Sequence, residues 1–111
     1  MNKYTELSDF EINKRVAYLF LDEGCYEINS YRQEVMYFRS GSGKGLYRDY
    51  DPCNDPSDAM PIIIENGISM VRVNNAWSAR QFNNHCIEIN GDNYYRIAME
   101  AYLLMKDAEN E

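Results

Sequence analysis

The sequence is short of the residues that metal sites and nucleophilic catalysis require. It contains one histidine, His85, and three widely separated cysteines, Cys25, Cys53 and Cys86. Zinc sites usually show a Cys-x-x-Cys or His-x-x-x-His pair, because two ligands on one turn pre-form half of the tetrahedron. No such pair occurs, and His85 and Cys86, as neighbours on a strand, would face opposite sides. We therefore expect no metal site, no cofactor and no catalytic residue.

Long apolar runs and clusters of positive charge are also missing. No stretch approaches the roughly 20 apolar residues of a membrane span, and the opening MNKYTELSDF lacks the apolar core of a signal peptide. Eleven Lys and Arg residues are scattered among eighteen Asp and Glu residues, and the net charge of -7 disfavours direct binding to nucleic acid. We expect a cytoplasmic protein without membrane contact, whose cysteines are reduced thiols.

The size and the apolar content favour one folded domain. The chain has 111 residues, of which 45% are hydrophobic, and this is enough for a single core over residues 1–111 with a frayed tail at 107–111. Ten tyrosines stand out. A tyrosine has an apolar ring and a polar tip, so an excess suits the edges of a small core or an interaction surface. We favour the core for most of these rings.

A polar run at residues 49–58 precedes three isoleucines and predicts a helix start. Asp55 before Pro56 is typical of an N-cap followed by proline at the first helical position. Asp58 lies three residues after that cap, where its carboxylate could reach back in a capping box. The spacing therefore predicts a short helix that begins at Pro56.

Pro61 is expected to interrupt this short helix. It has no amide hydrogen, and it pushes the preceding residue, Met60, toward an extended conformation. We expect a break near Met60 and a second turn that ends at Asn66-Gly67.

The remaining pattern predicts two long helices and several short strands. Apolar residues recur at helical spacing after a Ser8 cap and again after Asp92 or Asn93, whereas period-two alternation marks strands. The predicted helices cover 9–22 and 93–107, and the predicted strands cover 26–28, 35–37, 46–47, 68–73, 76–80 and 86–89. Short connections favour an α+β domain with a mostly antiparallel sheet and both terminal amphipathic helices packed on one face. In the last helix we expect Ile97 and Leu104 on the buried face and Glu100 on the exposed one.

Two motifs invite ligand hypotheses that their spacing does not support. The GSGKG run at 41–45 lacks the first glycine and the hydroxyl of a phosphate-binding loop, so a hairpin loop is the better interpretation. The densest group of carboxylates could bind a divalent cation, but it lacks the spacing of a calcium loop and is better explained by turns and caps. Its members are Asp49, Asp51, Asp55 and Asp58.

Three segments resemble the NinX-like family, which consists of short proteins encoded by lambdoid and related enterobacterial phages and prophages. They are YTELSDFEINKRVA near the start, DPCNDPSDAMPIIIENGIS in the middle and RIAMEAYLLMKD near the end. Residues 24–44 and 74–90 depart from the family's pattern. The resemblance implies a phage or prophage gene expressed in bacterial cytoplasm, and it carries over no activity and no catalytic residues.

Two classes of function remain open. The first is an interaction protein that modulates a host or phage protein, including an anti-defence role. The second is a small-ligand binder or enzyme that uses a cleft around residues 47–58 and 77. We favour the first, because no nucleophile, base or ligand set has the usual spacing. The candidate partner surface consists of Tyr47, Tyr50, Asp51, Asn54 and Trp77. An edge strand rich in tyrosine would also suit a homodimer.

Overall fold

Three helices and six strands alternate along the chain in a computed structural model that describes residues 2–38, 46–82 and 86–110. The helices are α1 (Asp9–Phe20), α2 (Pro56–Glu65) and α3 (Tyr94–Glu109). The strands are β1 (Tyr26–Asn29), β2 (Glu34–Phe38), β3 (Tyr47–Asp49), β4 (Ser69–Val73), β5 (Ala76–Gln81) and β6 (Ile87–Gly91). This order confirms the α+β class. The GSGKG run and His85 lie outside the described residues.

Each helix begins at a cap that the sequence predicts. Ser8 Oγ accepts a hydrogen bond from the Glu11 amide at 3.2 Å, and Asp55 Oδ1 accepts one from the Ser57 amide at 2.9 Å. Asn93 Oδ1 accepts from the amides of Tyr95 and Arg96 in the first turn of α3. These side chains satisfy amides that the helix itself leaves without partners. Within the described ranges, no helix is both long and apolar enough to cross a membrane.

α2 runs from Pro56 to Glu65 without interruption, so the predicted break near Met60 is wrong. Pro61 leaves the carbonyl of Ser57 without its helical donor, but Ser57 is exposed and water can reach it. Buried side chains on both sides of the proline stabilise the helix through tertiary packing: Ala59, Ile62 and Ile63.

Asp58 does not form the predicted capping box. Its carboxylate is buried and turns toward the loop before α2, where Oδ2 accepts from the Asp51 amide at 2.8 Å. Oδ1 accepts from the Arg48 guanidinium at 2.6 Å. The Arg48 guanidinium competes for the carboxylate better than the cap amide does, because a hydrogen bond between two charged groups is stronger than one from a neutral amide.

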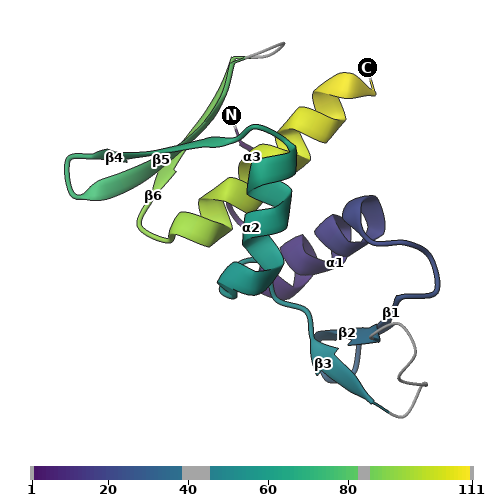
Figure 1. Ribbon diagram of the computed structural model, residues 1–111. Coiled ribbons are helices and arrows are strands. Elements are labelled where there is room, and N and C mark those ends of the chain that lie inside the picture. The colour runs from purple at the N-terminus through teal and green to yellow at the C-terminus, as the bar shows by residue number, and fades with distance from the viewer. Residues whose placement is uncertain (1, 39–45, 83–85, 111) are drawn as a thin grey trace.

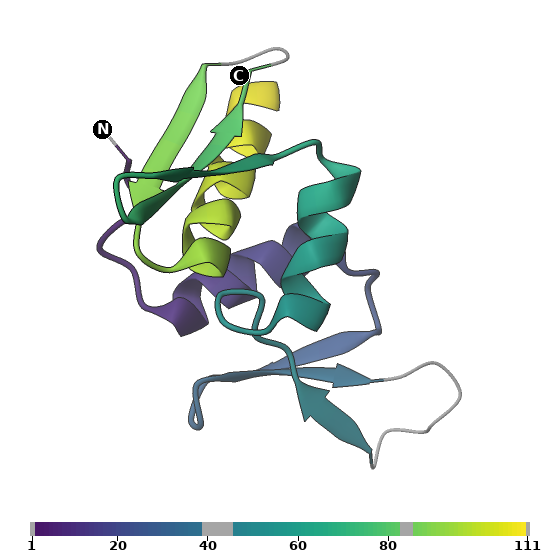
Figure 2. The same cartoon turned by 60° about the vertical axis from the view of Figure 1, so that its left-hand side comes forward.

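The strands form two separate antiparallel sheets, β1-β2-β3 and β4-β5-β6. The antiparallel pairing agrees with the prediction, but the division into two sheets differs from the single sheet expected. Figures 1 and 2 show the two sheets at opposite ends of the molecule, with the three helices between them. α1 packs on α3 and β2, whereas α3 packs on β5 and β6, so the long helices do not share one sheet face.

α3 lies at the centre of the core and is buried on most of its sides. Its buried residues are Ile97, Ala98, Met99, Glu100, Ala101, Tyr102, Leu103 and Met105. The burial of Ile97 confirms part of the predicted stripe, and Leu104 is half-buried. Glu100 was expected on an exposed face, but it is buried because α3 is enclosed by other elements.

The tyrosines divide between core and surface. Tyr4, Tyr50 and Tyr102 are buried, and four others are partly buried against the core. Tyr18 and Tyr31 are exposed. The expectation that most of these rings serve the core is therefore confirmed, although several remain available at the surface.

Candidate functional site

Arg96 connects α3 with α1 and with the segment that precedes α1. Its Nη1 donates to Asp9 Oδ1 at 2.6 Å, and its Nε donates to Glu100 Oε2 at 2.6 Å. Nη2 donates to the carbonyls of Tyr4 at 3.0 Å and Leu7 at 2.8 Å. Only 14% of the Arg96 side chain is exposed. The planar guanidinium suits this task, because it directs several donors along fixed directions.

Asn54 is a second connecting residue, at the point where the N-termini of all three helices meet. Its Nδ2 donates to Asp9 Oδ2 at 3.0 Å and to Asp51 Oδ2 at 3.1 Å, and its Oδ1 accepts from Asn93 Nδ2 at 3.2 Å. Asp9 opens α1, Asn54 directly precedes the cap of α2, and Asn93 caps α3. The Asp9 and Asp51 carboxylates thus lie near three positive helix ends. We call Asp9, Asp51, Asn54 and Asn93 the polar corner.

Hydrogen bonds at buried or partly buried atoms fix the loop that carries Asp51 and Asn54 of the polar corner. Asn13 of α1 donates to Asp51 Oδ1 at 2.8 Å and accepts from the Cys53 amide at 3.1 Å. Cys53 is fully buried, as expected for a small apolar side chain, and burial raises the pKa of its thiol. The two bonds of Asn13 tie the loop to α1. The three segments that carry the family resemblance contribute Asp9, Asn54 and Arg96, so they meet in this network.

The Asp9 carboxyl shows the electrostatic effect of the network. Burial by itself would raise its pKa, but hydrogen bonds from Asn54 and Arg96, with the charge of Arg96, hold the pKa below its ordinary value. A lowered pKa in the folded state means that the charged form stabilises the fold. This stability is fully present above the unfolded pKa of about 3.9 and is lost as the pH falls through the folded value.

Acidification is therefore expected to remove the advantage of the wild type over Asp9→Asn. At pH 7 the wild type should have the larger free energy of unfolding, and the difference should shrink as the pH falls below about 4. Urea denaturation of both proteins at pH 7, 5 and 3 measures this difference in the free energy of unfolding. A difference that stays constant over this range would show that the Asp9 charge does not stabilise the fold.

The structure brings together three of the five candidate surface residues. Asp51 and Asn54 belong to the polar corner. Trp77, on β5, packs edge-on against Tyr94 with ring centroids 4.8 Å apart, and Tyr94 directly follows Asn93. The corner and the Trp77 ring are thus joined through the first residues of α3.

Tyr47 and Tyr50 do not join this group. Tyr47 is 40% exposed on β3 and donates to Glu34 at 3.0 Å, at the opposite end of the molecule from β5 (Figure 1). Tyr50 is only 3% exposed, so its expected place on the surface is wrong. The centroid of its ring lies 5.7 Å from that of Tyr37. The Tyr50 amide donates to the carbonyl of Val35, and this bond holds the residue against β2 with its side chain in the core.

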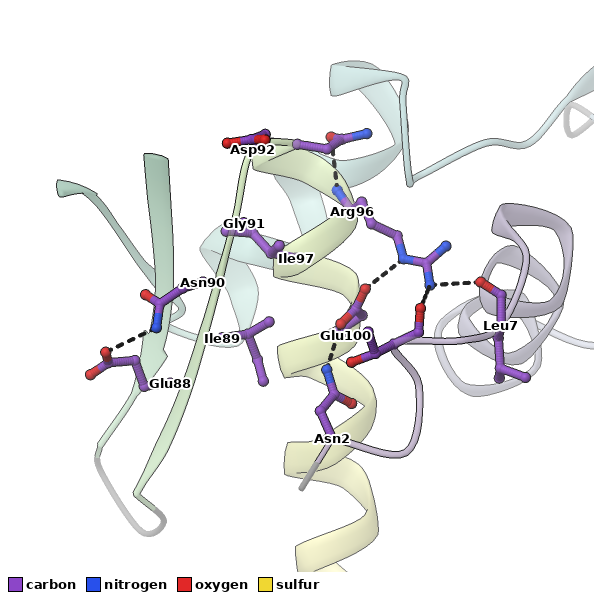
Figure 3. Close-up of a pocket in the computed structure, with 12 residues that line it drawn as sticks. Asn2, Leu7, Glu88, Ile89, Asn90, Gly91, Asp92, Arg96, Ile97 and Glu100 are labelled. Atoms are coloured by element: carbon purple, nitrogen blue, oxygen red, sulfur yellow. Dashed lines mark hydrogen bonds and ion pairs between the residues drawn. The ribbon is translucent and has the colours of Figure 1, made fainter. Parts of the chain in front are cut away.

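A hollow of about 520 Å³ lies beside the corner, between β6, α3 and the N-terminal segment. Figure 3 shows Ile89 of β6 and Ile97 of α3 in the space between the two elements. A Cβ added to Gly91 would lie 2.8 Å from Ile97 Cγ2, so glycine permits this close approach of strand and helix. In the sequence, Asn90-Gly91 follows the strand predicted at 86–89 and carries no signal of the hollow.

Four further residues of the site are not among the predicted surface residues: Asp9, Asn93, Tyr94 and Arg96. Asn93 was recognised as a cap, and Arg96 stood in a family-like segment, but neither signal indicates a partner 39 or 87 residues away. In the part of the chain that the structure describes, no three Asp, Glu, His or Cys side chains converge as metal ligands.

Comparison with known proteins identifies one family. The family described as "Bacteriophage P22, NinX" matches the chain over residues 3–106. No curated protein and no solved structure shows significant similarity to this chain.

Proposed function

Because the chain belongs to the bacteriophage P22 NinX family, we propose that it is a phage accessory protein that binds a protein of the phage or of its bacterial host. Its place of action would be the bacterial cytoplasm, and an anti-defence role falls within this class. Family membership assigns no enzymatic activity.

The rigid polar corner beside the Trp77–Tyr94 ring pair carries the proposal. The Asn54 side chain is exposed, whereas the loop beneath it is fixed by buried hydrogen bonds. Arg72 stacks over the Trp77 ring at 5.0 Å and extends the same surface. Aromatic and arginine side chains are typical of interface hot spots, and a preorganised loop loses little conformational entropy on binding.

A catalytic use of the corner has less support. The Asp9 carboxylate accepts hydrogen bonds from Arg96 and Asn54, and the Asp51 carboxylate accepts them from Asn13 and Asn54. A general base needs an accessible lone pair directed at a substrate. These carboxylates instead use their lone pairs to join the helices, so a binding surface explains the arrangement better than an acid–base pair does.

Partner capture with surface variants tests the proposal. The tagged chain would be recovered from phage-infected cells with its bound proteins. Arg72→Glu and Trp77→Ala should each reduce recovery of a stoichiometric partner by about tenfold or more, as expected for hot-spot residues. Tyr31→Ala is the control, because Tyr31 is 97% exposed in the turn between β1 and β2, away from this surface. Thermal melting of each variant separates loss of binding from loss of folding.

The same experiment can contradict the proposal. If Arg72→Glu folds normally and retains the partner, the corner and the Trp77 ring are not the binding surface. If Tyr47→Ala loses the partner instead, the surface lies on the β1-β2-β3 sheet.

A further inference from the structure

The turn between β4 and β5 shows which main-chain groups of β5 face β6. Asn74 and Asn75 have φ values of +49° and +68°, as in a two-residue hairpin turn. The flanking pair, Val73 and Ala76, is therefore hydrogen-bonded. Hydrogen-bonded and non-hydrogen-bonded pairs alternate along an antiparallel ladder, so the even-numbered residues of β5 bond to β4 and the odd-numbered ones bond to β6.

The register then identifies the free groups on β6. Ala79 of β5 pairs with Ile89, so the odd-numbered residues of β6 bond to β5. β6 is an edge strand, and the N–H and C=O groups of Glu88 and Asn90 point away from the sheet. Within the described ranges, no main-chain bond from outside the sheet reaches these groups. An edge of this kind is a template for another strand.

A groove runs along this free edge instead of a covering element. The hollow of about 520 Å³ beside Asn90 and a second one of about 380 Å³ beside Ile87 are both lined by Asn2, Glu88 and Ile89. Ile97 and Leu104 of α3 supply apolar surface to the two hollows. The N-terminal segment forms the far wall of the larger hollow, as Figure 3 shows at Asn2.

The charge around the groove is predominantly negative. Glu88, Asp92 and Glu100 line the larger hollow, and Arg96 is the only cation among its lining residues. Arg80 of β5 lies 3.6 Å from Glu88, so the carboxylates still outnumber the cations by three to two. The Arg96 guanidinium is already bonded to Asp9, Glu100 and two main-chain carbonyls. The chain as a whole carries a formal net charge of -7 at pH 7. Lysine or arginine on an incoming segment would therefore meet a favourable field.

We propose that the free edge of β6 binds an extended, basic segment of the partner protein as a fourth strand of the β4-β5-β6 sheet. The inference rests on the proposed function, because it gives the chemistry of that partner. Successive side chains of a strand point to opposite faces. One set would enter the groove against Ile89 and Ile97, and the other would lie on the outer face beside Glu88. A segment that alternates apolar and basic residues fits both faces.

A synthetic peptide tests the recognition directly. The probe is a fluorescein-labelled octapeptide of alternating lysine and valine, titrated against the full chain by fluorescence anisotropy. It should bind at least about tenfold more tightly than a glutamate–valine octapeptide, because of the charge, and than its form N-methylated at every residue, which lacks all of the strand donors.

Two variants at one position isolate the main-chain contact. Asn90→Pro removes an N–H that points to the free edge, whereas the β5–β6 ladder uses the main-chain groups of Ile89 and Gly91. It should weaken peptide binding by about tenfold or more. Asn90→Ala keeps the N–H and should bind as the wild type does. Hydrogen exchange on the unmodified chain gives a second readout: the Glu88 and Asn90 amides should exchange fast when free and slowly with peptide, and the Ile89 amide should be slow in both states.

Three results would overturn the inference. The first is no binding of the lysine–valine peptide, and the second is equal binding by the N-methylated peptide or by Asn90→Pro. The third is a dimer of the free chain that Asn90→Pro dissociates, which would assign the edge to a second copy. If the peptide test fails but the chain still captures a partner protein, the proposed function stands without the strand-binding inference. If the peptide binds but no partner protein is captured from infected cells, the proposed function is contradicted, whereas the strand-binding property of the β6 edge is not.

Discussion

Arg96→Ala is expected to lower the free energy of unfolding by about 3–5 kcal/mol, the usual loss when one member of a buried ion pair is removed. The change leaves the Glu100 carboxylate, of which 8% is exposed, without its cation. It also removes the donors to Asp9 and to two carbonyls of the N-terminal segment. Urea denaturation monitored by circular dichroism measures the loss.

Arg32→Ala is the matched control for this variant. Arg32 Nε lies 3.9 Å from Glu34 Oε1, and 65% of the Arg32 side chain is exposed. An exposed ion pair contributes about 0–1 kcal/mol to the free energy of unfolding. Equal losses for the two arginines would contradict the importance of the network. Glu100→Ala and the double variant complete a cycle, in which a coupling of more than about 1 kcal/mol is expected for groups in direct contact.

Tyr50 should respond in opposite directions to two substitutions. Tyr50→Ala is expected to cost about 3–5 kcal/mol, because it deletes a buried ring. Tyr50→Phe keeps the ring and removes a buried hydroxyl that has no hydrogen-bond partner among the described residues. Loss of an unsatisfied polar group should stabilise the fold by about 1 kcal/mol. Burial also raises the pKa of this hydroxyl, so it remains protonated at neutral pH.

Melting temperatures and denaturation midpoints of the two Tyr50 variants decide the prediction. Tyr4→Phe is a suitable comparison, because the Tyr4 hydroxyl donates to Asp107 and its removal should cost stability. If Tyr50→Phe destabilises as much as Tyr4→Phe, the Tyr50 hydroxyl has a partner in solution, such as a buried water. If Tyr50→Ala leaves the midpoint unchanged, the ring is not part of the core.

The sequence predicts local structure well wherever neighbouring residues determine it. Ser8, Asp55 and Asn93 are caps because a short polar side chain meets amides two or three residues away. Asn74-Asn75 predicts the hairpin for a similar reason, since both residues tolerate positive φ. These predictions require no knowledge of the rest of the molecule.

The errors concern groups whose partners are distant in sequence. Asp58 has the spacing of a capping box but bonds to Arg48 and to the loop before α2. Glu100 stands on the polar side of the helical pattern, and nothing in that pattern shows that the N-terminal segment will cover it. Trp77 was placed near Asn54 by its order in the chain, and the connection through Tyr94 became visible only in three dimensions.

The division of the strands into two sheets could not be predicted either. Periodicity shows that a segment is a strand, but pairing depends on which edges meet. α2 enters between β3 and β4, and the three helices separate the sheets (Figure 2). The candidate surface was consequently divided: Asp51, Asn54 and Trp77 stayed together, and Tyr47 went to the other end.

The meeting of the three helix starts has a consequence for synthesis on the ribosome. The Asp9 carboxylate accepts hydrogen bonds from Asn54, which lies 45 positions later in the chain, and from Arg96, which lies 87 positions later. α1 can therefore form and contact the loop before α2 during translation, but their junction lacks its cation until the final helix has emerged. Contacts of such long sequence separation form late, after the entropy of closing the chain has been lost. A nascent chain that stalls before Arg96 would leave the Asp9 carboxylate without its cation and would expose the apolar surfaces against which α3 packs, which makes it a substrate for chaperones and proteases.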